Sequence, residues 1–180
     1  MSPVTHCAAG LLGWQKFAEK KSLKTLVIFL FIANLPDIDF ALFLFMGRKG
    51  LEMHQFYTHN VFFVLFTTLL FLPLFKEKKE HIGLLLAAFS HLFLDILTID
   101  GAAPYGFRLF YPFSHRLFNL GIFPNLWKDN LSEVFSFHNL WVIAFETAVF
   151  LLPVLLVYRK PFGEFFNLKN HGKYNIPDRS

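Results

Sequence analysis

The sequence predicts an all-α protein, a polytopic membrane helical bundle with four spanning helices and a short N-terminal helix. Three observations predict this fold class. The 180 residues are 54% hydrophobic and include 26 Phe, more apolar character than a soluble domain usually carries. Four apolar runs reach or approach the ~20 residues that cross a bilayer core ~30 Å thick. The basic residues gather between these runs, as they do in the loops of membrane proteins.

The elements follow from the apolar runs in chain order. We expect a short helix over residues 4–18 and spans over residues 23–45, 60–75, 82–98 and 139–158. The first run is interrupted at "NLPDID", because Pro36 lacks a helical donor and disfavours the helical conformation of Leu35. The second run is long enough to span only if its helix starts near His54.

The remaining segments complete a single domain over residues 1–160, followed by a polar tail over residues 161–180. Residues 100–138 are rich in aromatic residues, Gly and Pro, which suits an interfacial cap in the headgroup zone. The N-terminus lacks a basic region before its apolar run, so we expect no cleaved signal peptide. The single Cys7 excludes an internal disulfide, and no motif indicates nucleic-acid binding.

The distribution of Lys and Arg predicts the orientation in the membrane. Positive residues precede the first run, separate the second from the third, and follow the fourth, at Lys16, Lys20, Lys21, Lys24, Lys76, Lys78, Lys79, Arg159 and Lys160. These segments should be cytoplasmic by the positive-inside rule. We therefore expect a multi-pass protein of the inner (cytoplasmic) membrane, with the loop over residues 100–138 outside and the C-terminus in the cytoplasm.

Polar side chains inside the apolar runs are the candidate functional residues. In "SHLFLDILTIDG", His91 and Asp95 stand at positions i and i+4 and share one helix face, where two side chains can grip one cation. Ionisable groups within a membrane span are expensive and usually functional. Metal binding is the favoured interpretation, and a structural hydrogen-bonded pair or a proton relay are the alternatives.

Three further sets of polar residues are expected at the same depth. Asp37 and Asp39 follow Pro36; one of them could cap a helix, but a pair in an apolar span favours metal binding and suits a carboxylate that bridges two cations. His54 and His59 lie at the outer entry to the second run. His6 lies ten residues before Lys16, or ~15 Å along a helix, which brings it to that level.

Several motifs together resemble a known family. They are "TH" with Gly10, "LPDID", "HQFYTH", "SHLFLD" followed by "DG", and "YPFS", and they cover roughly residues 5–115. This series resembles the YdjM-like family of membrane-bound, metal-dependent hydrolases, which is distantly similar to the zinc-dependent phospholipase C and nuclease superfamily. In place of the usual "HRGxTHS" the chain has Gln55, Phe56 and Asn60, so a fixed positive charge is missing.

The resemblance implies one or two divalent metal ions, with zinc favoured, and a site that includes Asp39 and His59 as catalytic residues. The implied metal set is His6, Asp37, Asp39, His54, His59, His91 and Asp95.

The function that we expect is hydrolysis of a phosphoester or lipid-linked substrate by water activated at the metal. Arg108 and Arg116 offer planar donors for phosphate and should form a substrate-facing lip in "GFRLFYPFSHR", with membrane lipid as the partner. An aromatic belt anchored to lipid phosphate is the alternative for this segment. A proton- or ion-coupled transporter is a second hypothesis, although no internal repeat supports alternating access. A metal-stabilised scaffold without turnover is a third.

Overall fold

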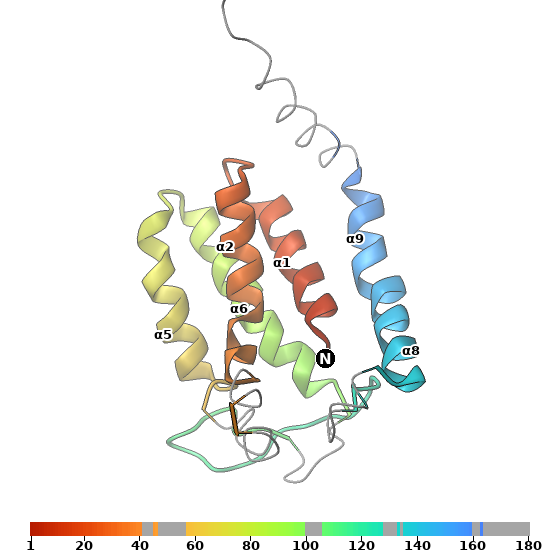
Figure 1. The fold of residues 1–180 in the computed structure, drawn as a ribbon. Helices are drawn as coiled ribbons and strands as arrows, with labels where there is room; N and C mark the ends of the chain where they lie inside the picture. Colours follow the sequence, from red (N-terminus) through yellow and green to blue (C-terminus); the bar gives the residue numbers. More distant parts are fainter. Residues whose placement is uncertain are drawn as a thin grey trace, which may run out of the picture.

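The computed structural model of the protein describes residues 1–40, 45–46, 57–99, 106–127, 133, 135–159 and 163. Every regular element among them is a helix, and pairing of strand type is limited to two isolated bridges. The helices stand side by side in a bundle, and the segment over residues 106–127 runs across one end of it (Figure 1). The predicted all-α fold class is therefore confirmed.

Helix α1 (Pro3–Phe17) begins at an N-cap serine and has Pro3 at its first position, where a missing donor costs nothing. It packs against α2 and α6. Its last turn is closed by Lys21, whose Nζ donates to the carbonyl oxygens of Trp14, Gln15 and Ala18 at 2.6, 2.6 and 3.0 Å. The short N-terminal helix predicted over residues 4–18 is confirmed.

Helix α2 (Leu23–Asn34) ends one residue before Leu35, and the chain continues as the 3₁₀ helix η1 (Leu35–Phe40). The break predicted at "NLPDID" is thus confirmed. The change to a 3₁₀ helix follows from Pro36, because a proline in mid-helix removes an α-helical hydrogen bond. Asp37 and Asp39 both lie on η1.

Helix α5 (Val61–Phe71) is capped by Asn60, whose side-chain oxygen accepts a bond of 2.8 Å from the amide of Phe63. The short 3₁₀ helix η2 (Leu72–Leu74) ends it. Helix α6 (Lys78–Ile96) carries His91 and Asp95 and packs against α1, α2 and α5. In its first turn Lys79 pairs with Glu19, and the hydrogen bond from Lys79 lowers the pKa of that carboxyl group.

The C-terminal helix is continuous and consists of α8 (Phe137–Glu146), the π-helical segment η3 (Thr147–Leu151) and α9 (Leu152–Val157). Within the described residues, this stretch alone is long and apolar enough to cross a membrane, while Val61–Leu74 is a shorter apolar helix. Of the four predicted spans, the one over residues 139–158 is therefore confirmed by its length and hydropathy. The first run is divided at η1, and the second contributes too few described helical residues.

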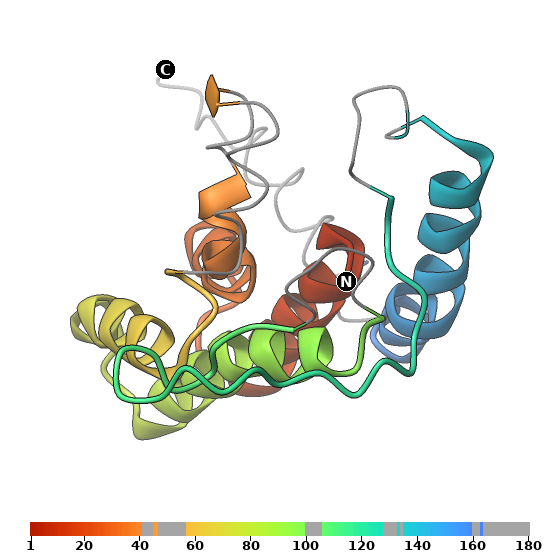
Figure 2. The same ribbon diagram turned by 90° about the horizontal axis from the view of Figure 1, so that it is seen from below.

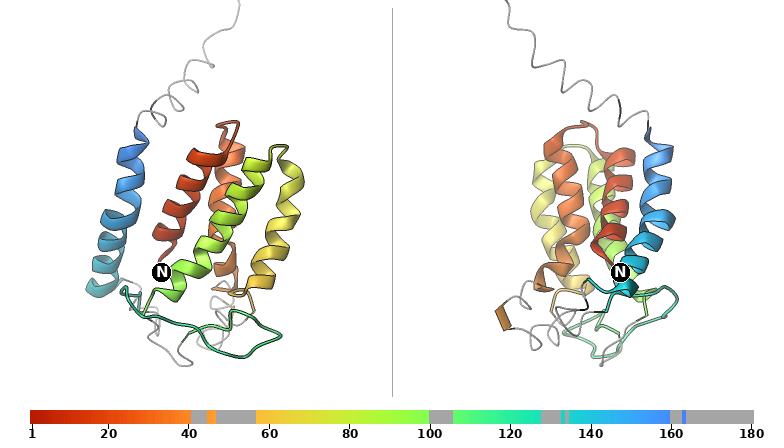
Figure 3. Two further views of the ribbon diagram at one scale, coloured as in Figure 1. Left: turned by 180° about the vertical axis from the view of Figure 1, so that it is seen from behind. Right: turned by 45° about the vertical axis from the view of Figure 1, so that its right-hand side comes forward.

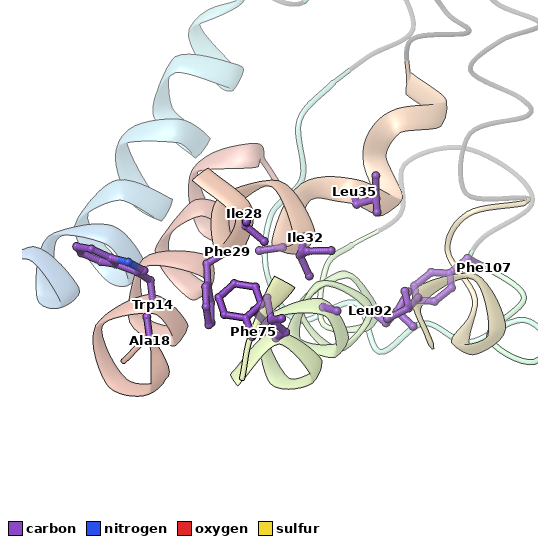
Figure 4. Close-up of a cluster of buried hydrophobic side chains, with 14 residues drawn as sticks. Trp14, Ala18, Ile28, Phe29, Ile32, Leu35, Phe75, Leu92 and Phe107 are labelled. Atoms are coloured by element: carbon purple, nitrogen blue, oxygen red, sulfur yellow. The ribbon is translucent and has the colours of Figure 1, made fainter. Parts of the chain in front are cut away.

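The apolar core lies where α1, α2 and α6 meet. Trp14, Phe29 and Ile32 are fully buried there (Figure 4). Leu84 is fully buried in the same cluster. Helices α1 and α6 can approach closely because residue 83 of α6 is a glycine. A Cβ atom there would lie 2.3 Å from the Cβ of Phe17 on α1. This packing holds α1 beside α6, so the polar residues near one end of each helix can meet.

Candidate metal centre

Five of the predicted residues come together near the end of the bundle that residues 106–127 cross. His6 is on α1, Asp37 is on η1, His59 lies two residues before the start of α5, and His91 and Asp95 are on α6. Figure 2, which views the bundle from this end, shows the 106–127 segment running beneath α6. The three histidines and Asp95 are buried, whereas the Asp37 side chain is 22% exposed.

Four of these residues can direct one atom each toward a common point. Asp37, His59, His91 and Asp95 offer ligand atoms that all lie within 4.8 Å of one another. Asp95 Oδ2 is 3.2 Å from His91 Nε2 and 3.3 Å from His59 Nε2. Asp37 Oδ1 is 3.6 and 3.3 Å from the same two nitrogens. Two imidazole nitrogens and two carboxylate oxygens are a donor set that zinc accepts, so this group could hold a metal ion.

The outer nitrogen of His91 fixes the orientation of its ring. His91 Nδ1 lies 2.8 Å from the carbonyl oxygen of Ala33, which can only accept, so Nδ1 carries the proton. In the neutral ring the lone pair of Nε2 then faces the common point. Metal-binding histidines typically donate their other N–H to a carbonyl or carboxylate in this way.

His59 is oriented by Thr58 and Asp39. The Thr58 hydroxyl donates to Asp39 Oδ2 at 2.6 Å, so its oxygen is left to accept from His59 Nδ1 at 3.1 Å. His59 Nε2 consequently faces His91 Nε2 at 3.2 Å. Asp39 Oδ2 is 3.8 Å from His59 Nδ1, on the outer side of the ring, and Asp39 is outside the group of four.

His6 lies against the same centre from the side of α1. Its ring is fully buried and stacks on His91, with centroids 3.8 Å apart and planes at 17°. His6 Nε2 is 3.4 Å from Asp95 Oδ1 and 4.0 Å from Asp37 Oδ2. Across the described part of the chain neither ring nitrogen of His6 has a hydrogen-bond partner. A buried imidazole thus points toward the second oxygen of each carboxylate.

Several contacts at the centre were not predicted from the sequence. The amino group of Met1 donates to Asp95 Oδ1 at 2.6 Å, and Ala33 and Thr58, which are not among the predicted site residues, contribute a carbonyl and a hydroxyl. Away from the centre, Glu146 on α8 accepts hydrogen bonds from Ser2 and Thr5. For Thr58 the available signal was its position next to His59.

The other predicted site residues lie elsewhere. His54 is outside the described residues. Arg116 is exposed, with its guanidinium 5.5 Å from the centre of the Phe118 ring, and Arg108 is partly buried. Phe107, next to Arg108, packs edge-on against His59 with ring centroids 5.8 Å apart. The first residues of the predicted lip over residues 106–116 therefore lie beside the His/Asp cluster.

The helical bundle and its buried His/Asp group define a membrane-type helical protein with a candidate metal site. A family model described as "YdjM inner membrane protein" matches residues 1–162, so the chain belongs to this family. The match extends beyond the motifs of residues 5–115 and includes Glu146 and α9. Neither a search of curated proteins nor a search of solved structures found a match.

Proposed function

We propose that the protein is a membrane-bound, metal-dependent hydrolase with zinc at Asp37, His59, His91 and Asp95. One observation carries this proposal: the Nε2 atoms of His59 and His91 lie 3.2 Å apart and face the two carboxylates, while both Nδ1 atoms have acceptors of their own. Two lone pairs and two carboxylate oxygens directed at one buried point repel one another unless a positive charge lies between them. A divalent cation supplies that charge with the preferred N and O donors.

The arrangement of the carboxylates supports a second ion on the side of His6. Asp37 Oδ1 and Asp95 Oδ2 face His59 and His91, whereas Asp37 Oδ2 and Asp95 Oδ1 face His6. A carboxylate that directs one oxygen to each side in this way is suited to bridging two cations. Asp95 Oδ1 also accepts from Met1, but a carboxylate oxygen has a further lone pair.

The two halves of this pair would differ in chemistry. The half with His59 and His91 has four protein donors, as in a closed structural zinc site. The half with His6 has three, the number found at catalytic zinc, which leaves a position for water or substrate. Bound zinc would acidify water and polarise a phosphoryl oxygen.

Side chains around the proposed metal ions would orient a ligand and give substrate access to the site. We propose that Asp39 and His59 support catalysis through the metal centre, because Thr58 and Asp39 hold the outer side of the His59 ring and so direct its Nε2 inward as a ligand. The Asp37 side chain is the partly exposed member of the cluster. Substrate should therefore approach from the side of η1.

A lipid-linked phosphoester is the substrate class that we propose. Phe107 packs on His59, so the lip over residues 106–116 lies beside the centre and could present Arg108 and Arg116 to phosphate. Exposed apolar side chains on α5, including Phe62, Phe66 and Leu70, suit contact with lipid and support the four-span arrangement. In this arrangement the lip faces outward and the C-terminus lies in the cytoplasm.

Loss of metal is expected to abolish turnover. With the protein purified in detergent and offered soluble and lipid-linked phosphoesters, a chelator should lower the hydrolysis rate roughly 100-fold or more, and zinc should restore it. The control is His81→Ala, which changes a histidine on α6 that contacts the Phe75 carbonyl outside the cluster; its rate should match the wild type. A rate that the chelator leaves unchanged would contradict the proposal, and bound zinc without hydrolysis would favour the scaffold.

His6→Ala should remove one ion and leave the other. The substitution deletes the one histidine that the described residues place on the second side, whereas the donors at Asp37, His59, His91 and Asp95 remain. Elemental analysis should therefore find about two zinc ions per wild-type chain and about one in the variant. About one ion in both proteins would eliminate the second ion while leaving the first site intact.

A further inference from the structure

Glu146 is a buried carboxylate that the proposed chemistry does not use. It is the last residue of α8, and it accepts four hydrogen bonds from the N-cap and the first turn of α1. The Ser2 amide donates to both of its oxygens at 3.1 and 3.0 Å, and the hydroxyls of Ser2 and Thr5 donate to Oε2 at 2.5 and 2.6 Å. A carboxylate in this position also suits the positive end of the α1 dipole.

The residues that Glu146 holds are neighbours of two groups at the centre. Ser2 follows Met1, whose amino group donates to Asp95 Oδ1 at 2.6 Å. Thr5 precedes His6, whose Nε2 lies 3.4 Å from that same oxygen. The contact with Glu146 therefore fixes two properties of the turn that carries His6, namely its position along the axis of α1 and its rotation about that axis.

The helix that contains Glu146 changes form directly after it. The π-helical segment η3 begins at Thr147 and packs against α1, and Figure 3 shows the C-terminal helix standing beside α1. Helical segments of the π type are rare and are often found at functional sites. This irregular turn lies where the C-terminal helix meets α1. It is therefore a second observation that points to a functional role for the contact between Glu146 and α1.

We propose that Glu146 is a positioning residue for the metal centre: by holding Ser2 and Thr5 it seats α1 so that His6 faces Asp95. This inference rests on the proposed function, because it requires metal at the cluster. It assigns the C-terminal helix a role in the site, although none of its residues belongs to the metal-binding group of four.

Zinc titration of metal-free Glu146→Gln tests this inference. Glutamine keeps the shape of the side chain but removes the charge and one acceptor. The affinity for the ion bound by His6 should fall roughly tenfold or more, as for other groups that orient ligands, and the ion at His59 and His91 should bind as before. The matched control is Glu80→Gln, a buried carboxylate at the far end of α6 that accepts from the Glu19 amide.

The thermal midpoint of each metal-free variant separates positioning from general destabilisation. Both variants should melt below the wild type, but Glu80→Gln should keep the wild-type zinc affinity. Should Glu146→Gln fail to fold, Thr5→Val removes one donor to Glu146 and should weaken the same ion. Unchanged affinity in the foldable variant, or an equal loss in Glu80→Gln, overturns this inference alone. A wild-type protein that binds no metal overturns the proposed function and this inference with it.

Discussion

His91→Ala is expected to abolish metal binding at the group of four and hydrolysis with it. The substitution deletes a buried donor whose Nδ1 is fixed by Ala33 and whose Nε2 faces Asp37, Asp95 and His59. It also removes the ring on which His6 stacks. Because one ligand and the orientation of others are lost together, we expect zinc affinity to fall by more than roughly 100-fold. Competition with a chromogenic chelator measures it.

The metal-free His91→Ala protein should also be less stable. Without the imidazole, the carbonyl oxygen of Ala33 loses the hydrogen bond from Nδ1, and an unsatisfied buried polar group costs about 1–3 kcal/mol. His91→Gln keeps a polar side chain there and serves if the alanine variant does not fold. His81→Ala is the control, since the same change on the same helix should leave zinc affinity unaltered. Equal affinities in wild type and His91→Ala would contradict the placement of the ion.

Asp95→Asn is expected to affect both ions at once. One Asp95 oxygen faces His59 and His91, while the other faces His6 and accepts from Met1, so this carboxylate joins every part of the centre. Asparagine has nearly the same shape but a single acceptor oxygen and no charge. Elemental analysis should find that the variant loses both ions, and its hydrolysis rate should fall to that of the chelated wild type.

Asp39→Asn is the matched control for this prediction. Asp39 is also buried and also belongs to the polar cluster, but its oxygen lies on the outer side of His59. Zinc stoichiometry should therefore be kept, while the rate falls because the orientation of His59 is weakened. If Asp95→Asn retained both ions and Asp39→Asn lost them, the roles that we assign to the two carboxylates would be reversed.

The sequence was sufficient to predict the all-α class, the break at Pro36 and the meeting of His6, Asp37, His59, His91 and Asp95. These predictions succeeded because each used a local rule: the missing donor of proline, the shared face of residues i and i+4, and the rise per residue that sets depth along a helix. Such rules act within one element and need no knowledge of its neighbours.

The separation of Asp37 from Asp39 could not be predicted in the same way. We treated them as a pair, but they lie on the 3₁₀ helix η1, where residues two apart point about 240° from each other. Asp37 consequently faces the centre, and Asp39 faces the outer nitrogen of His59. The contact of Glu146 with Ser2 and Thr5 joins residues that are 144 and 141 positions apart in the sequence, and no local pattern encodes which elements pack together.

The zinc content of the purified wild-type protein tests the central claim most directly. Elemental analysis of protein purified in detergent without added chelator should find at least about one equivalent of zinc per chain, held by the four converging side chains. His91→Ala, prepared in parallel, should contain about one equivalent less, because it loses the ion held by these four side chains. A wild-type content below roughly a tenth of an equivalent, unchanged after incubation with zinc, would contradict a metal centre at this site.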